Sequence, residues 1–253
     1  TNEKFFDGTP LTKKVLNWKK QLILRADHII SISENTKNDI VSYYNIDPAK
    51  ITTIYLAGGF DVIPKNKEME LVDTKHVKDY ILFVGSRSKY KNFNDFATEI
   101  APLLYKYDLD LLVAGGGKLN LDEINLLKSL NIYDRVVTYS HVSDSHLANL
   151  YKNAMVFIFP SLYEGFGIPV LEAMQCQCPV LLSNNSSLPE VGGSAAEYFD
   201  PFIKGDLKNV LEKLILNDDA RTQMKIKGLQ QALKFNWDIT AVKHAEVYKL
   251  ITA

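Results

Sequence analysis

Two glutamates separated by seven residues flank a glycine-rich turn in the second half of the chain. The segment from Phe159 to Met174 reads FPSLYEGFGIPVLEAM, with Glu164 in the turn and Glu172 further on. The apolar residues before the turn predict the end of a buried strand, and Pro169 is typical of the first turn of a helix. Exposed amides at a helix N-terminus attract anions. The segment therefore predicts a site for a negatively charged ligand, with a carboxylate on each side.

Basic side chains follow an apolar run earlier in the chain. The sequence VGSRSKYKN places Gly85, Arg87 and Lys91 at the end of a strand predicted at 80–85. Fixed cations in a partly dry cleft stabilise the negative charge that grows on a leaving diphosphate. Because ligands bind beyond the carboxyl ends of parallel strands, we expect this loop to lie near the turn at Glu164. The plainer alternative is a pair of surface cations on a solvated loop.

Together these segments resemble the retaining glycosyltransferases of family 4. The resemblance rests on Glu164-x7-Glu172 within SLYEGFGIPVLEAM, and on Arg87 and Lys91 within VGSRSKYKN. It implies a two-domain GT-B enzyme of the bacterial polysaccharide type that uses a nucleotide-activated sugar. It also implies a set of donor-binding residues, namely Gly85, Arg87, Lys91, Val142, Glu164, Gly165, Phe166, Gly167, Ile168 and Glu172.

The resemblance further implies a role for each group. Arg87 and Lys91 would hold the donor diphosphate, and Glu164 would face the donor sugar, so these three are the catalytic candidates. Glu172 would accept hydrogen bonds from ribose hydroxyls, a task that suits a carboxylate. Val142 would lie beside the base.

Several residues of the turn also have plainer explanations. Gly165 and Gly167 suit a close backbone approach or a positive φ. Phe166 fits packing as well as ligand contact. Glu164 could cap the helix, and Glu172 could be a solvated helix residue.

Composition narrows the classes of function. The chain has 253 residues and a formal net charge of −1, which argues against nucleic acid as a partner. Its two cysteines, Cys176 and Cys178, suggest neither a disulfide framework nor a metal site, and we expect them to pack in the core. With cations and amides to hold a diphosphate, we expect no metal and no cofactor. A UDP- or GDP-sugar would be a substrate.

One departure from the family lies between the two cysteines. The family usually has glycine at this position, where this chain has Gln177. If the site needs a positive φ, glutamine costs about 1 kcal/mol.

Alternating patterns predict a doubly wound, parallel α/β sheet of the Rossmann-like type. We predict donor-side strands at 80–85, 109–114, 136–139, 155–159, 179–182 and 196–199. We predict helices at 10–25, 33–44 (with Ser33 as N-cap), 95–107, 121–129, 143–153, 203–233 and 238–251, and upstream strands at 26–33 and 51–56.

The chain divides into three predicted parts. Residues 1–66 read as a remnant of the acceptor-side domain and a linker, the polar stretch 60–78 being the linker, and 67–235 as the nucleotide-sugar donor-binding domain. Residues 236–253 form a C-terminal helix that, by the resemblance, crosses back to the acceptor side. A full acceptor-side domain needs roughly 150 residues. We therefore expect the rest of it in the same gene product or in a partner chain.

The segment 10–25 combines apolar residues with lysines and contains no acid. This pattern predicts peripheral contact with an anionic membrane, while a core-packed helix with a solvated basic face is the alternative. No apolar run approaches the ~20 residues of a membrane span, and no signal peptide is visible. The two cysteines fit a reduced setting, so we expect a cytoplasmic location, at the inner face of the cell membrane where the helix binds lipid.

The predicted reaction is metal-independent, retaining transfer of a hexose-type sugar from a nucleotide-diphosphate sugar. The predicted acceptor is a hydroxyl of a glycan or of a lipid-linked acceptor. One alternative is a catalytically idle nucleotide-sugar-binding subunit of a two-chain assembly. Another is a related GT-B epimerase or a starch-type synthase.

Overall fold

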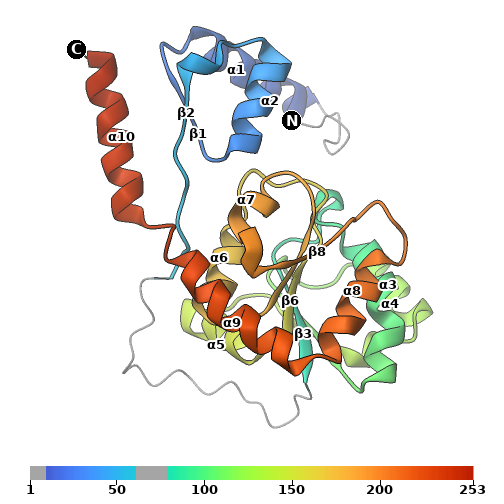
Figure 1. The fold of residues 1–253 in the computed structure, drawn as a ribbon. Helices are drawn as coiled ribbons and strands as arrows, with labels where there is room; N and C mark the ends of the chain where they lie inside the picture. The colour runs from blue at the N-terminus through green and yellow to red at the C-terminus, as the bar shows by residue number, and fades with distance from the viewer. Residues whose placement is uncertain (1–9, 61–78, 253) are drawn as a thin grey trace. The chain divides into compact units, whose positions relative to one another are not determined.

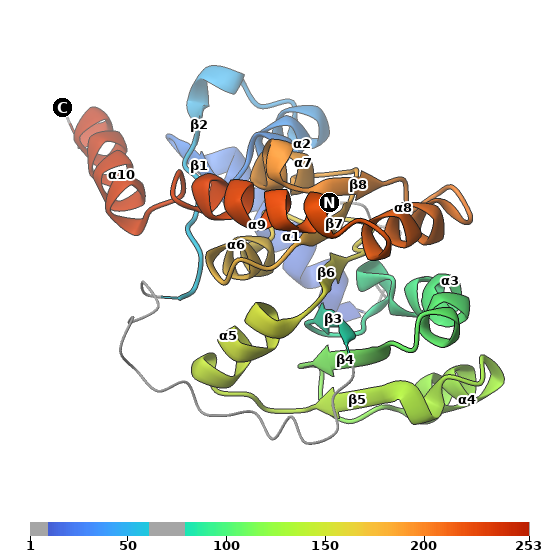
Figure 2. The same cartoon turned by 60° about the horizontal axis from the view of Figure 1, so that its bottom comes forward.

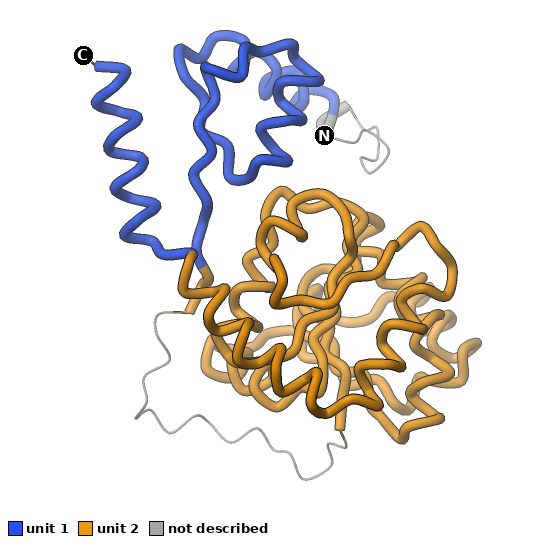
Figure 3. Tube along the Cα trace, in the orientation of Figure 1, with its two compact units in different colours: residues 1–57, 235–253 blue, residues 58–234 orange. Residues whose placement is uncertain are grey.

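The computed structural model describes residues 10–60 and 79–252. It divides into two compact units, one formed by residues 1–57 and 235–253 and the other by residues 58–234 (Figure 3). Almost all of the predicted linker, and the predicted boundary between residues 66 and 67, lie outside the described residues.

The first unit contains a small β-α-β motif between two long helices. Its elements in chain order are α1 (Pro10–Arg25), β1 (Ile29–Ser31), α2 (Glu34–Tyr44), β2 (Ile51–Thr53) and α10 (Trp237–Thr252). Strands β1 and β2 pair in parallel, and both are shorter than predicted. Ser33 caps α2 as predicted, because its Oγ accepts a hydrogen bond from the Thr36 amide at 2.9 Å.

Helix α10 joins the first unit although it ends the chain. Thr240 Oγ1 donates to the Tyr55 carbonyl at 2.8 Å, and the ring of Phe235 lies 5.7 Å from that of Tyr55. These contacts attach the last helix to the segment that follows β2.

The second unit is built on a six-stranded, fully parallel sheet, which confirms the predicted fold class. Its strands are β3 (Tyr80–Val84), β4 (Asp110–Ala114), β5 (Val136–Tyr139), β6 (Val156–Phe159), β7 (Val180–Ser183) and β8 (Glu197–Phe199). They lie in the order β5-β4-β3-β6-β7-β8 (Figure 2). All five residues of β3 are buried, as expected for a strand covered on both faces.

Helices cover both faces of this sheet (Figures 1 and 2). Helices α3 (Phe93–Lys106), α4 (Leu121–Ser129) and α8 (Asp206–Ile215) lie on one side; α5 (Asp144–Asn153) and α6 (Ile168–Gln175) lie on the other. The short α7 (Leu188–Gly192) follows β7, and α9 (Asp218–Ala232) packs on α6. On the first side the rings of Phe83 and Phe93 lie 5.2 Å apart.

The segment predicted as helical at 203–233 contains two helices, α8 and α9, with a break between them. Helix α8 ends at Ile215, and α9 begins after Asn217, whose side chain accepts a hydrogen bond from the Ala220 amide at 2.9 Å. A strong N-cap inside an otherwise helical pattern starts a new helix, and this explains why the break at Asn217 was not predicted.

The strand order reverses between β3 and β6. From β3 the chain moves outward through β4 and β5 and then returns to β6 on the other side of β3. In an open α/β sheet, ligands bind outside the carboxyl ends of the strands at such a reversal. The fold thus selects the loops after β3 and β6, which carry Lys91 and Glu164. Within residues 10–60 and 79–252, no helix has both the length and the apolar character to cross a bilayer.

Candidate functional site

The loops after β3 and β6 meet at the edge of the sheet. The Leu162 amide donates to the Tyr90 carbonyl at 2.7 Å, which joins the two loops through their backbones. The neighbouring residue Lys91 lies in a single 3₁₀ turn, Lys89–Lys91. This contact fixes the position of Lys91 opposite the glycine-rich turn.

Lys91 and Glu164 form an ion pair. The Lys91 ammonium lies 2.7 Å from Glu164 Oε1, and the two side chains are 12% and 13% exposed. The ammonium also lies 4.5 Å from the centroid of the Phe159 ring, at the end of β6. The structure therefore brings together two predicted site residues that are 73 positions apart in the sequence.

Polar side chains after β7 hold the glycine-rich turn in place. Ser186 Oγ accepts from the Glu164 amide at 3.0 Å, and Ser187 Oγ donates to the Glu164 and Phe166 carbonyls at 3.0 and 2.9 Å. Asn185 Nδ2 donates to the Leu162 carbonyl at 2.9 Å. These contacts leave the Glu164 carboxylate as the part of the residue that faces Lys91.

Helix α6 begins at the predicted turn with an uncapped N-terminus. Gly167 has φ +110° and provides no side-chain cap, and a Cβ there would lie 3.0 Å from a methyl carbon of Leu188. The first N–H groups of a helix lack intrahelical acceptors, so this end can receive an anion. Phe166 is 3% exposed, so it packs in the interior, as the plainer of its two explanations predicted.

Glu172 lies one turn into α6, and its carboxylate faces different partners from that of Glu164. The Tyr151 hydroxyl donates to Glu172 Oε2 at 3.3 Å. Burial raises the pKa of Glu172, and the hydrogen bond from Tyr151 partly opposes that shift. A Cβ on Gly59 would lie 2.5 Å from Glu172 Oε1, so a glycine at 59 leaves room for this carboxylate.

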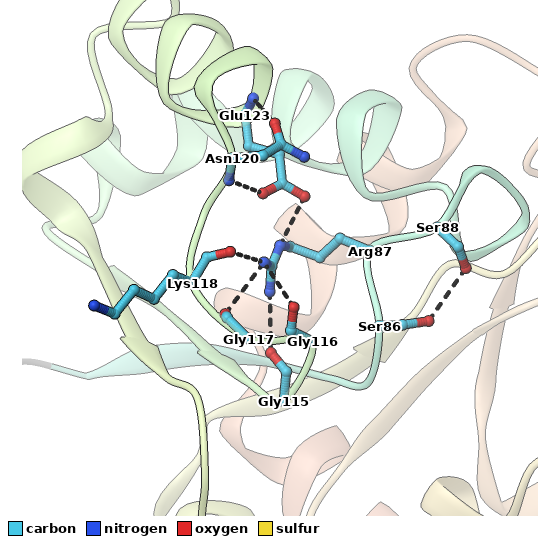
Figure 4. A network of polar contacts seen from close by, with 9 residues as sticks. All are labelled: Ser86, Arg87, Ser88, Gly115, Gly116, Gly117, Lys118, Asn120 and Glu123. Atoms are coloured by element: carbon cyan, nitrogen blue, oxygen red, sulfur yellow. Dashed lines mark hydrogen bonds and ion pairs between the residues drawn. The ribbon is translucent and has the colours of Figure 1, made fainter.

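Arg87 points toward the loop after β4. Its Nε lies 2.8 Å from Glu123 Oε1, and each terminal nitrogen donates to backbone carbonyls of residues 115–118 (Figure 4). Its side chain is 3% exposed. All three guanidinium nitrogens therefore have protein acceptors, and a diphosphate would have to compete for them.

The remaining predicted residues lie at the same ends of the strands. Gly85 follows β3 with φ +122°, and its amide donates to the Ala114 carbonyl at 2.8 Å. Val142 follows β5 and precedes Ser143, the N-cap of α5. The assignment of Val142 to the base stays a prediction.

Sequence reasoning missed Glu123, Tyr151 and Ser187. Only Glu123 left a signal: Asn120 and Glu123 have the N-x-x-E spacing of a capping box, which the structure forms at the start of α4. Read together with the preceding glycines, that box would have placed a carboxylate beside the loop after β4. Tyr151 and Ser187 belong to no motif in the sequence, and only the tertiary structure brings them into contact with Glu172 and with the turn at Glu164.

The cysteines are buried and free, as expected for core residues. Burial raises the pKa of Cys176 to about 12, so its thiol is neutral at ordinary pH. Among the residues that the structure describes, no three His, Cys, Asp or Glu side chains gather as a metal site. Gln177 has φ +54°, so the position does adopt the left-handed conformation that the glycine of the family suggested.

Two family models match the chain. The model described as Glycosyl transferases group 1 matches residues 65–231, and the model described as Glycosyltransferase Family 4 matches residues 4–57. The first match contains both glutamates, Arg87 and Lys91. It therefore covers the whole candidate site at the edge of the sheet.

Relatives include bacterial sugar transferases. The chain is 30% identical over 233 residues to O-antigen chain mannosyltransferase B of Escherichia coli, covering 89% of this chain and 61% of that protein. It is 30% identical over 212 residues to an O-antigen chain mannosyltransferase of Salmonella typhimurium, covering 84% and 53%. The chain thus spans little more than half the length of these relatives.

Solved structures share the fold. Sucrose-phosphate synthase from Thermosynechococcus elongatus superposes with a TM-score of 0.78 at 19% identity, over 100% of this chain and 64% of that one. An Anabaena protein in complex with UDP and glucose superposes with a TM-score of 0.77 at 16% identity, over 97% and 69%. At these identities the likeness concerns the fold.

Proposed function

The chain belongs to the group 1 glycosyl transferases, whose family model matches residues 65–231, and we propose the function of its second unit from this. The second unit binds the diphosphate of a nucleotide sugar where β3 and β6 end. The observation that carries this proposal is the Lys91–Glu164 ion pair beside the uncapped N-terminus of α6. A cation and free amides at a strand-order reversal form an anion site, and the adjoining carboxylate suits a sugar.

Each group has a separate task in the proposal. Lys91 and the first amides of α6, at Gly167 and Ile168, hold the diphosphate. Glu172 accepts hydrogen bonds from the ribose hydroxyls, and Glu164 faces the sugar. The raised pKa of Glu172 reflects a carboxylate kept in a poorly hydrated place, where a hydrogen bond from a ligand is strong.

The transfer step exchanges one bond of the anomeric carbon for another. The bond to the diphosphate oxygen breaks, and its electron pair stays on the diphosphate. The acceptor hydroxyl oxygen bonds to the anomeric carbon from the same face, and its proton passes to the departing diphosphate oxygen. Lys91 and the α6 amides stabilise the growing negative charge without a metal. Glu164 carries charge opposite to that of the oxocarbenium-like sugar.

The names of relatives suggest the substrate class. Relatives at 30% identity are named O-antigen chain mannosyltransferases. A structural neighbour was solved with UDP and glucose. We infer a hexose donor, with mannose and glucose as the first sugars to test, and a glycan or lipid-linked acceptor for polysaccharide synthesis.

Helix α1 suggests where the enzyme works. Its side chains include exposed Trp18 and Leu22, which are 53% and 71% exposed, together with four lysines. An amphipathic basic helix binds anionic lipid surfaces. We propose that α1 holds the protein at the inner face of the cell membrane; sedimentation with anionic but not neutral vesicles, lost in Trp18→Ala, is the expected result. Equal recovery with both vesicle types would contradict it.

Calorimetric titration of the chain with UDP, GDP and ADP tests the donor site. We expect one nucleotide to bind more tightly than the others, and Glu172→Ala to weaken it. Binding of none of the three would refute the proposed function.

Transfer assays of the full-length gene product separate an enzyme from an idle binding subunit. With UDP-glucose and GDP-mannose as donors, we expect sugar transfer that persists in the presence of a chelator. Nucleotide binding without transfer would favour the idle subunit. Loss of transfer on chelation would contradict the metal-independent step.

A further inference from the structure

Arg87 is held by a dense set of acceptors in the interior of the second unit. Beyond Glu123, its Nη1 donates to the Gly115 carbonyl at 3.0 Å, and its Nη2 to the Lys118 carbonyl at 2.9 Å. The carbonyls of Gly116 and Gly117 each lie 3.2 Å from Nη2. The guanidinium thus lies in a ring of backbone oxygens (Figure 4).

The three glycines are shaped for this contact. Gly115, Gly116 and Gly117 have φ values of +90°, +72° and +75°, a left-handed run that other residues rarely adopt. A Cβ on Gly116 would lie 2.7 Å from Arg87 Nη1. The run turns successive carbonyls toward one cation and leaves room for it.

Glu123 completes the arrangement from the other side. Its Oε1 accepts from Arg87 Nε at 2.8 Å, and its Oε2 accepts from the backbone N–H of Asn120 at 2.8 Å. The Asn120 side chain accepts in return from the Glu123 amide at 2.9 Å. The side chain of Glu123 is 8% exposed, so both of its oxygens are used in a nearly dry place.

We propose that Arg87 is a positioning residue: with Glu123 it clamps the 115–118 loop against the end of β3, and it is not a ligand of the diphosphate. The inference rests on the proposed donor site, next to which this loop lies. A Cβ on Gly115 would lie 3.5 Å from Gly85 backbone atoms, so the loop borders the chain that leads to Lys91. The planar guanidinium of arginine presents five N–H donors in a fixed fork, whereas a lysine ammonium presents three donors from a single nitrogen.

Two substitutions weaken the clamp in different ways. Arg87→Lys keeps the charge and loses the fork. Glu123→Gln leaves one acceptor oxygen where the glutamate has two. If that oxygen keeps the capping hydrogen bond with the Asn120 backbone N–H, as glutamine does at this helix position, an NH2 group that cannot accept faces Arg87. Glu212→Gln is the matched control, because the Lys106–Glu212 ion pair has the same 2.8 Å distance on an exposed surface.

Nucleotide titrations separate a clamp from a ligand. Titrating UDP and UMP, or GDP and GMP, we expect Arg87→Lys and Glu123→Gln each to lower affinity roughly threefold to tenfold. The affinities for the diphosphate and for the monophosphate should fall by the same factor. The double variant should bind nucleotide no more weakly than the single variant with the lower affinity. The proposal is overturned if Arg87→Lys reduces only diphosphate affinity while Glu123→Gln leaves it unchanged or raises it.

Tryptic cleavage after Lys118 tests the clamp without any nucleotide. The Lys118 carbonyl accepts from Arg87, and Lys118 itself is exposed. We expect cleavage of the Lys118–Leu119 bond, mapped by mass spectrometry, to be several-fold faster in both clamp variants than in the unmodified chain and in Glu212→Gln. Equal rates in all four proteins would overturn the proposal. If no nucleotide binds the unmodified chain, the donor site fails, and this measurement still decides the clamp.

Discussion

The ammonium of Lys91 lies 2.7 Å from Oε1 of Glu164, and the two residues come from loops after neighbouring strands, β3 and β6. Both side chains are largely shielded from water, so each charge depends on the other for compensation. The pair also joins the proposed diphosphate contact to the proposed sugar contact. A change in one residue should therefore affect both stability and transfer.

Lys91→Gln should lower sugar transfer at least about 100-fold, the scale expected when a charge that stabilises the transition state is lost. It should also lower the free energy of unfolding by about 1–3 kcal/mol, since Glu164 then lacks its partner in a mostly buried place. Steady-state kinetics and urea unfolding measure the two effects. Lys89→Gln, an exposed lysine of the same turn, is the control and should change neither. Full activity in Lys91→Gln would remove Lys91 from the site.

Glu172→Gln should weaken nucleotide binding roughly tenfold or more, in line with ~1.5–3 kcal/mol for hydrogen bonds to a charged group.

The Glu172→Gln variant should also be more stable than the unmodified chain at neutral pH. Burial raises the pKa of Glu172 above its ordinary 4.5, so the folded chain holds this proton more tightly than the unfolded chain. The resulting stability is present below pH 4.5 and is lost as pH rises through the folded pKa.

Thermal unfolding across pH checks the sign of this effect. The advantage of Glu172→Gln should shrink as pH falls. Glu212→Gln should behave oppositely, because a hydrogen bond from Lys106 lowers the pKa of Glu212. Stability from Glu212 is present above pH 4.5 and lost on acidification. Parallel pH profiles for the two variants would contradict the assignment.

Tyr151→Phe should raise the pKa of Glu172 further, because the carboxylate loses a hydrogen-bond donor. As the pH is lowered, nucleotide affinity should then begin to fall at a higher pH than in the unmodified chain. Titrations at several pH values measure the midpoint of this fall in affinity. Tyr80→Phe is the matched control, since the buried Tyr80 hydroxyl donates to the Leu150 carbonyl at 2.8 Å. It should cost similar stability and leave the midpoint unmoved. A shared shift would mean that Tyr151 acts only through packing.

Gln177→Gly should raise the free energy of unfolding by about 0.5–1 kcal/mol. Gln177 is exposed, has φ +54° and follows the end of α6, where glycine avoids the strain of the left-handed conformation. Urea unfolding measures the change. Gln223→Gly, an exposed glutamine inside α9, should instead lower stability by about 1 kcal/mol. A loss at both positions would show that Gln177 makes a compensating contact.

Much of the fold and part of the site could be predicted from local patterns. Apolar runs located the central strands β3, β6 and β7, because a strand covered on both faces must be apolar throughout. The outer strands β5 and β8 are only partly buried and were located by the alternation of strands with helices. Alternation of strands and helices makes the sheet parallel, which brings the loops of Lys91 and Glu164 to one edge. The helix break at Asn217 was missed, because an N-cap inside a helical pattern changes the structure without interrupting the pattern.

Local patterns were enough to predict which residues lie beyond the carboxyl ends of the strands, because periodicity and strand direction are local properties. The pairing of those residues depends on the folded arrangement of distant segments. Arg87 and Lys91 look equivalent in the sequence, yet Lys91 pairs with Glu164 while Arg87 pairs with Glu123 and the glycine carbonyls. The partner of Lys91 lies in the turn after β6, and the partners of Arg87 lie in the loop after β4 and in α4. Side-chain hydrogen bonds between such distant segments follow no sequence period. The directions of the Arg87 and Lys91 side chains therefore depend on how the loops pack around the whole sheet.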